Sequence, residues 1–195
     1  FRGRNNKSEV LIPVAQVVYS TDTSSSKRSI DEDSSTTEFD STTLFKLRKI
    51  PGIDRQENGL RLNAGLQYFY EYKDNYKYNV NLGQVYRNKN SEDFLPSSGL
   101  NGYESDILLS GNLSFRKDFE IASNQVYSKN FTLKRSNTSL KLTKPRYQIK
   151  TSLTNLVSDP SEGTSTDLKE FTLNLNSNFT KNWSGKLGLR RNMVN

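Results

Sequence analysis

The sequence predicts an all-β fold, an antiparallel up-and-down transmembrane β-barrel segment that forms a partial barrel of about nine strands. Three observations support this. Apolar and polar residues alternate strictly in several stretches, of which residues 59–86 are the longest. Long polar segments tend to alternate with short turn-like segments between these stretches. No stretch shows a convincing helical period, and no apolar run approaches the ~20 residues of a membrane helix.

The composition fits a sheet that is apolar on one face only. Of the 195 residues, 32% are hydrophobic and 11% aromatic, mostly Tyr and Phe. A soluble domain of this length normally has more apolar residues for its core. Transmembrane strands are only ~9–11 residues long and give a weak hydropathy signal. The aromatic content argues against disorder along the whole chain.

The chain contains no Cys and no His, which excludes disulfides, zinc–thiolate sites and the usual catalytic triads. We predict no catalytic residue, cofactor or metal site, and no enzymatic activity. The net charge of +7 suggests an anionic partner such as lipid, another phosphate-rich molecule or nucleic acid. The positive residues are spread over many strands without a clustered motif, so no nucleic-acid partner is expected.

The first strand is expected at residues 10–19, with Pro13 at an edge or a bulge because proline cannot donate to a ladder. A long polar loop follows at 20–57, and its partly apolar stretch LFKLRKIPGIDRQ is expected to form a short ordered segment.

A hairpin of residues 58–73 and 76–88, joined by a tight turn at 74–75, is the most regular part of the chain. One parity is apolar or aromatic and comprises Leu60, Leu62, Ala64, Leu66, Tyr68, Tyr70 and Tyr72, then Tyr76, Tyr78, Val80 and Leu82. The other is polar and includes Arg61, Asn63, Gln67, Glu71 and Lys73, then Lys77, Asn79 and Asn81. We expect the first parity to face lipid and the second to face a wet interior.

The later strands are expected near 104–117, 119–127, 131–142, 147–156 and 171–179, with a last strand from 183. Long loops are predicted at 20–57, 88–103 and 157–167, and short turns at 74–75, 117–118, 143–146 and 180–182. Outer-membrane barrels show this asymmetry, with long extracellular loops and short periplasmic turns. Aromatic residues lie near many strand ends, where barrels meet the membrane interfaces: Tyr19, Tyr72, Tyr76, Tyr86, Phe115, Phe119, Tyr127, Phe179 and Trp183.

Several short stretches are similar to a known family. They are LIPVAQVVYS, EFDSTTLFKLRKIPGIDRQENGLRLNAGLQY, LGQVYR and SSGLNGYESD. In order and spacing they resemble the C-terminal barrel domain of the LPS-assembly outer-membrane protein family LptD, also called OstA or Imp. The matching residues are Pro13, Ala15, Gln16, Glu38, Phe39, Asp40, Leu44, Phe45, Gly52, Asp54, Arg55, Glu57, Gly59, Gly83, Gln84, Tyr86, Ser98, Gly99, Leu100, Ser105 and Asp106. The rest of the chain fits only as generic barrel strands.

The resemblance implies a translocon without bond chemistry in the bacterial outer membrane. With an LptE-like lipoprotein plug, such a barrel receives lipopolysaccharide (LPS) from a periplasmic Lpt bridge and releases it into the outer leaflet. Residues 1–195 are interpreted as an internal fragment of one such barrel domain. By this interpretation the N-terminal periplasmic domain and the strands that form the lateral gate lie outside the chain.

Two groups of residues are candidates for function. The first consists of cations on the polar parity, which are expected to line the lumen and meet LPS phosphates or the plug, because phosphates favour Arg and Lys. They are Arg61, Lys73, Lys77, Arg87 and Arg116, with Lys186 and Arg190 further along the chain. The second is the loop motif of Asp54, Arg55 and Glu57, which would close the barrel or shape the lipid path. The alternatives are a solvated wet wall for the cations and a turn stabilised by an Asp–Arg pair for the motif.

Two other functions stay open at this point. The chain would also suit another outer-membrane barrel, such as a porin or a TonB-dependent receptor, which small-solute conductance would reveal. It would also suit a soluble β-rich adhesin or carbohydrate-binding module, which would stay in solution without detergent.

Overall fold

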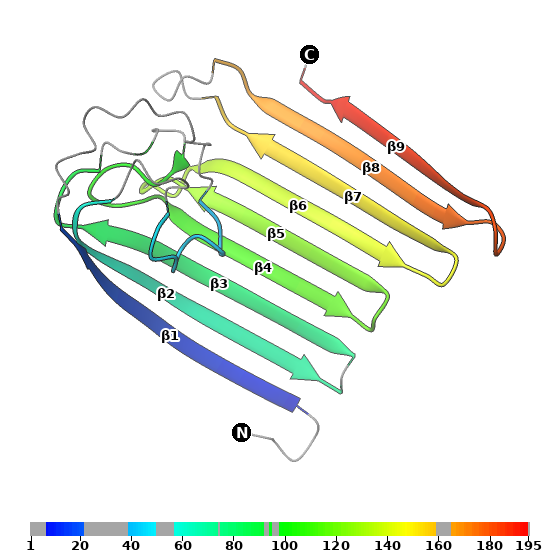
Figure 1. Ribbon diagram of the computed structural model, residues 1–195, viewed down its shortest axis with the longest axis horizontal. Coiled ribbons are helices and arrows are strands. Elements are labelled where there is room, and N and C mark those ends of the chain that lie inside the picture. The colour runs from blue at the N-terminus through cyan, green and yellow to red at the C-terminus, as the bar shows by residue number, and fades with distance from the viewer. Residues whose placement is uncertain are drawn as a thin grey trace.

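The computed structural model describes residues 7–21, 39–49, 57–73, 75–91, 94, 98–158 and 165–194. These residues form one nine-stranded antiparallel sheet, in which each strand pairs with the next along the chain (Figure 1). The strands are β1 Lys7–Ser20, β2 Gly59–Tyr72, β3 Tyr76–Arg87, β4 Ile107–Phe115, β5 Phe119–Tyr127, β6 Leu133–Thr143, β7 Tyr147–Leu156, β8 Leu168–Asn178 and β9 Ser184–Asn192. β1 and β9 are the two edges, so the described sheet is an open meander, as expected for part of a barrel. In the described part of the chain, no helix is long and apolar enough to cross a membrane.

The connections fall into two classes, one at each end of the strands. We call the end at which β1, β3, β5 and β7 finish the loop edge, and the end at which β2, β4, β6 and β8 finish the turn edge. This confirms the predicted alternation. Two strands stop earlier than expected, β2 at Tyr72 and β4 at Phe115. Lys73 (φ 50°) and Arg116 (φ 52°) adopt the left-handed conformation, which ends a strand and starts a turn.

The strand register separates two chemically different faces. Directly paired residues lie on the same face of a sheet, and Leu66 pairs with Leu82, which in turn pairs with Leu109. The face that these residues share exposes apolar side chains, among them Val17, Leu62, Leu66, Leu82, Leu113, Leu153, Leu187 and Leu189. The opposite face carries Asn63, Asn81, Ser110, Asn112 and Asn124. The two parities predicted for the β2–β3 hairpin are therefore present and continue into the strands that follow, whereas β1 places Val10, Ile12, Val14 and Val18 on the face of Asn63.

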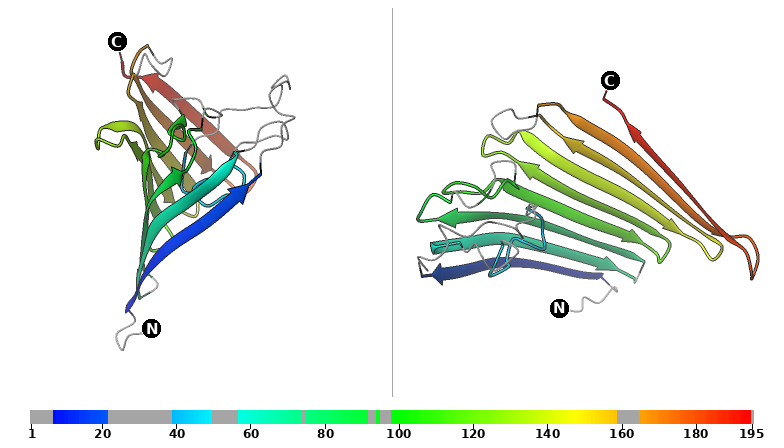
Figure 2. Two further views of the ribbon diagram at one scale, coloured as in Figure 1. Left: turned by 90° about the vertical axis from the view of Figure 1, so that its left-hand side faces the viewer. Right: turned by 45° about the horizontal axis from the view of Figure 1, so that its top comes forward.

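The apolar core lies on the polar face and near the loop edge. Its buried residues are Phe39, Leu44, Phe94 and Leu100 from the loops and Val85, Leu108 and Val126 from β3, β4 and β5. The sheet curves, and the loop residues lie on the inner side of the curve (Figure 2). We call this inner side the concave face and the apolar outer side the convex face. The core is therefore formed by loops packed against one end of the sheet.

Candidate functional site: a loop docked on the concave face

Residues 39–49 form an ordered segment, here called the docked loop. The Asp40 carboxylate accepts hydrogen bonds from the backbone N–H groups of Thr42 and Thr43, both at 2.8 Å. Such an Asx turn folds the chain back locally, so that Phe39 and Leu44, 1% and 2% exposed, both enter the core. The ordered segment expected at residues 44–56 is confirmed for residues 44–49, and residues 50–56 lie outside the described residues.

Two strand glycines make room for the docked loop. A Cβ atom on Gly83 of β3 would lie 2.1 Å from Leu44 Cδ2, and one on Gly65 of β2 would lie 2.9 Å from Phe45 Cζ. Neither distance is compatible with a side chain at the glycine position. Gly65 and Gly83 pair directly across the two strands, so together they leave a notch in the concave face that Leu44 and Phe45 fill.

A buried ionic cluster lies beside this notch. The Glu57 carboxylate accepts hydrogen bonds from Arg61 Nη1 at 2.5 Å and from Arg87 Nη2 at 2.9 Å. These three side chains are only 3–5% exposed. Arg61 also donates to the backbone carbonyl of Leu47 in the docked loop. The cluster therefore joins β2 and β3 to the docked loop, with one carboxylate serving two guanidinium groups.

A second polar chain links the docked loop to β1. Lys49 is only 3% exposed. Its Nζ donates hydrogen bonds to Asn63 Oδ1 at 3.1 Å and to the Lys46 carbonyl at 3.2 Å. Asn63 Nδ2 donates in turn to Gln16 Oε1 at 2.6 Å. Burial away from water disfavours the charged amine and lowers the pKa of Lys49 to about 8. Within the described part of the chain, both hydrogen-bond acceptors of this amine are neutral oxygen atoms.

The second long loop covers the neighbouring part of the concave face. Ser105 is fully buried, accepts a hydrogen bond from Val85 N at 2.9 Å and donates to the Asp106 carbonyl at 2.8 Å. Asp106 also forms an ion pair with Lys134 of β6, with 3.2 Å between Asp106 Oδ2 and Lys134 Nζ. Leu100 of the same loop enters the core beside Val85. Two loops therefore close the concave face of β2–β5 near the loop edge.

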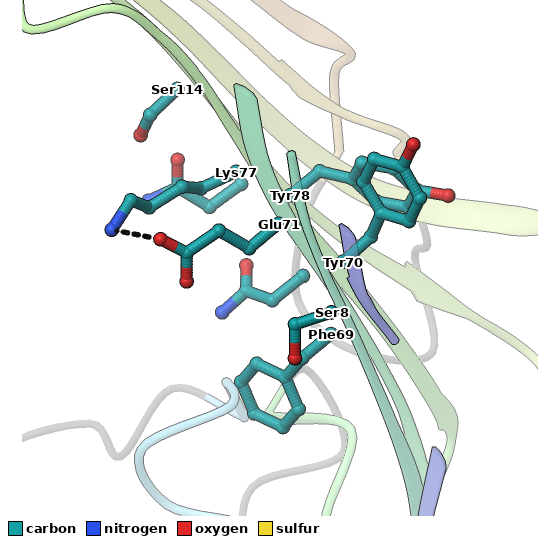
Figure 3. Close-up of a pocket in the computed structure, with 9 residues that line it drawn as sticks. Ser8, Phe69, Tyr70, Glu71, Lys77, Tyr78 and Ser114 are labelled. Atoms are coloured by element: carbon teal, nitrogen blue, oxygen red, sulfur yellow. Dashed lines mark ion pairs between the residues drawn. The ribbon is translucent and has the colours of Figure 1, made fainter. Parts of the chain in front are cut away.

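Towards the turn edge the concave face is open and lined by polar groups. A cavity of about 250 Å³ lies there, with an ion pair of 2.7 Å between Lys77 Nζ and Glu71 Oε1 in its wall. Ser8, Phe69 and Ser114 lie on the same side of the sheet as this pair, whereas Tyr70 and Tyr78 point to the opposite side (Figure 3). The arrangement offers hydroxyl, amide and paired charged groups, which suit contact with a polar molecule.

The structure brings some of the predicted residues together and separates others. Arg61 and Arg87 meet at Glu57, whereas Lys77 lies apart on Glu71. Lys73 and Arg116 occupy turns, with their charged groups 5.1 Å from the ring centroids of Tyr72 and Phe115. Further along the sheet, Lys186 pairs with Asn176 in register and Arg190 contacts Glu170 at 2.6 Å. Asp54 and Arg55 lie outside the described residues.

For the polar-parity cations, contact with LPS or the plug remains a prediction. Lys73 and Arg116 depart from the expected strand positions for a specific reason. Each follows the last strand residue in a left-handed conformation, and each lies over a ring of the convex face. The buried positions of Arg61 and Arg87 favour a role in holding the docked loop.

Sequence reasoning missed Lys49, Asn63 and Gln16 as a connected group. A signal was present in the strands: Val85, Leu108 and Val126 are apolar residues on the inward parity, and all three lie at the loop edge. Apolar residues at inward positions of a wet barrel wall need a covering partner. The docked loop and the second long loop supply this cover.

Comparison with known proteins agrees with the geometry. A family model described as LptD, LPS transport system D, matches residues 2–183. No curated protein matches the chain. The matched range contains the docked loop, the second long loop and the ionic cluster, together with the whole of β1–β8.

Proposed function

The chain belongs to the LptD family of LPS-transport proteins, and from this premise we propose that its concave face is a wall of the path along which LPS moves. Members of this family are outer-membrane β-barrels that assemble LPS into the outer membrane, and they are not enzymes. The proposal concerns which face and which residues of this chain serve that function.

One observation carries the proposal, namely the inverted polarity of the sheet. Leu66, Leu82 and Leu113 are 38–44% exposed on the convex face. On the concave face, Asn79 and Asn112 pair directly across β3 and β4. A sheet with an apolar outer face and a polar inner face suits a membrane wall around a wet lumen. Sugars and phosphates of LPS find hydrogen-bonding partners on such an inner face.

A pair of neighbouring positions on β4 tests this assignment. A photo-crosslinking amino acid at Asn112 of the full-length protein in cells should capture pulse-labelled, newly made LPS. The same group at Leu113 lies at the same depth but on the convex face, and should capture bulk membrane phospholipid instead. Equal capture of new LPS at the two positions, or capture at Leu113 alone, would contradict the proposal.

We also infer that an LptE-like lipoprotein plug lies against the open cavity near the turn edge, and that a periplasmic Lpt bridge delivers LPS to the barrel. The cavity at Lys77 and Glu71 supports the first inference, because it leaves polar groups of the inner wall uncovered by the docked loops. A crosslinker at Ser114 should form an adduct that an antibody against the plug lipoprotein detects. The outward neighbour Phe115 is the control, and an adduct at Phe115 but not at Ser114 would refute the contact.

We assign to the docked loop and the second long loop the role of closing the lumen at the loop edge. Glu57, Arg61 and Arg87 support it by joining the docked loop to β2 and β3. The barrel would then admit small solutes only after the loop detaches. A planar-bilayer conductance measurement on the full-length protein should show low current, and loss of the Glu57 carboxylate should raise it.

A further inference from the structure

A second cavity, of about 480 Å³, lies at the turn edge between the β6–β7 turn and the β8–β9 turn. Its charged lining residues are Arg146 and Lys181, both cations and both exposed. Phe179 and Trp183 also line it, and they are 67% and 73% exposed. Two positive charges and two large exposed rings therefore surround one hollow.

Backbone hydrogen bonds hold the two turns together. Asn178 N donates to the Arg146 carbonyl at 2.7 Å, so the β6–β7 turn is fixed to the end of β8. In the β8–β9 turn, Thr180 Oγ1 accepts a hydrogen bond from Trp183 N at 3.1 Å. Both cations are therefore carried on backbone segments with defined positions.

The glycine at position 185 positions one of the rings. A Cβ atom on Gly185 would lie 2.8 Å from Phe179 Cε2, so the ring occupies space that any other residue would fill. Strand alternation places Phe179 and Trp183 on the same face as Gly185, which pairs with Ser177 on the convex face. The rings therefore point towards the side that faces lipid in a barrel.

The charge at the turn edge is unbalanced beside this cavity. The nearby carboxylate of Asp118 is already paired with Lys144 at 2.7 Å. Among the residues that the structure describes, neither Arg146 nor Lys181 forms an ion pair with a carboxylate. An anion with apolar chains would complement both the two cations and the two rings.

We propose that this cavity binds the phosphodiester headgroup of a glycerophospholipid in the periplasmic leaflet of the outer membrane. Arg and Lys side chains supply charge-assisted donors for the phosphate, and basic pockets at membrane interfaces bind lipid headgroups. Trp and Phe at the interface pack beside the glycerol and the first acyl carbons. A phospholipid is favoured over LPS because short turns of outer-membrane barrels face the periplasm, whereas LPS fills the opposite leaflet.

The test is a titration of the complete protein in detergent with short-chain phosphatidylglycerol, followed by native mass spectrometry. Arg146→Gln/Lys181→Gln should weaken binding roughly tenfold or more, the loss expected when about 1.4 kcal/mol of binding free energy disappears. Lys117→Gln/Lys129→Gln removes the same charge from other exposed sites and should leave binding within about twofold. Arg146→Lys/Lys181→Arg keeps both charges and should retain binding, which separates the loss of charge from misfolding.

Three results would overturn the proposal. Equal weakening by the site variant and the Lys117/Lys129 variant would mean that lipid binds through general charge. Displacement of the lipid by equimolar inorganic phosphate would identify a free-anion site. Preference for lipid A over phosphatidylglycerol would assign the cavity to LPS itself. None of these results bears on LPS capture at Asn112, so the two proposals fail independently.

Discussion

Arg87 Nη2 lies 2.9 Å from Glu57 Oε1, although thirty residues separate the two in the chain. The Arg87 side chain is 3% exposed and the Glu57 side chain 5%. A charge buried to this extent in a lumenal position is stable only if it is paired. The pair therefore fixes the residue just before β2 to the end of β3, and Arg61, which shares Glu57, donates a hydrogen bond to the Leu47 carbonyl of the docked loop.

Glu57→Gln should release the docked loop. The substitution removes the carboxylate that Arg61 and Arg87 share and leaves both guanidinium groups buried. Breaking a buried ion pair in this way costs about 3–5 kcal/mol of stability. Mass-spectrometric mapping of proteinase K cleavage within residues 39–49 of the full-length protein would detect the release. Glu104→Gln is the control. Glu104 Oε2 lies 3.8 Å from Lys129 Nζ, and both side chains are about half exposed. Such an exposed ion pair contributes at most about 1 kcal/mol to stability. Unchanged protection in Glu57→Gln would refute the anchoring role.

Gly83→Ala should displace the same loop by a different mechanism. The new methyl group would overlap Leu44 Cδ2, and Ala64 O lies 3.1 Å from it on the other side. Overpacking of this kind costs about 1–3 kcal/mol. Gly111→Ala is the matched control, because its nearest contact is Asn79 O at 3.6 Å. If the two variants showed equal cleavage in residues 39–49, the notch formed by Gly65 and Gly83 would not position the loop.

Leu66→Arg and Gln67→Arg test the facing of β2. Leu66 is 39% exposed on the convex face, and Gln67 is the next residue, on the concave face. An arginine on the lipid side near mid-strand should cost roughly 2–4 kcal/mol, whereas one on the lumen side should cost much less. Urea titration of the complete barrel folded into lipid vesicles measures the free energy of unfolding of both variants. Equal destabilisation would mean that the two faces are wrongly assigned.

The alternating parities of β2, β3 and β4 were predictable because a residue repeat of two is a local property of the chain. The pairing within β2–β3, β4–β5, β6–β7 and β8–β9 followed from the short turns that join these neighbours. The ionic cluster was not predictable, because Glu57, Arg61 and Arg87 look like three solvated charges until the loop is placed over them. Arg61 and Arg87 were singled out only as wall residues. The inward apolar residues Val85, Leu108 and Val126 near the loop edge were a sequence feature that required a cover.

Lys49 gives the docked loop a dependence on pH. Burial lowers the pKa of this amine to about 8, from an ordinary value of 10.5. Between these two pH values the released loop binds more protons than the docked loop, so docking becomes more favourable as pH rises through this window and gains nothing further above it. The gain is at most about 3.4 kcal/mol, because each pH unit between the two pKa values corresponds to about 1.36 kcal/mol. A lysine ¹³Cε NMR titration of the full-length protein should show one resonance that titrates near pH 8.

The variant Lys49→Met separates this effect from other titrations. Methionine fills similar space without a proton to lose, so docking should lose its dependence on pH between 8 and 10.5. The ratio of wild-type to Lys49→Met cleavage rates within residues 39–49 cancels the dependence of the protease itself on pH. This ratio should fall as pH rises, because only the wild-type loop docks more tightly. A constant ratio, together with lysine resonances that all titrate above pH 10, would mean that Lys49 is solvated. The docked loop would then be held only by the ionic cluster at Glu57 and by the notch of Gly65 and Gly83.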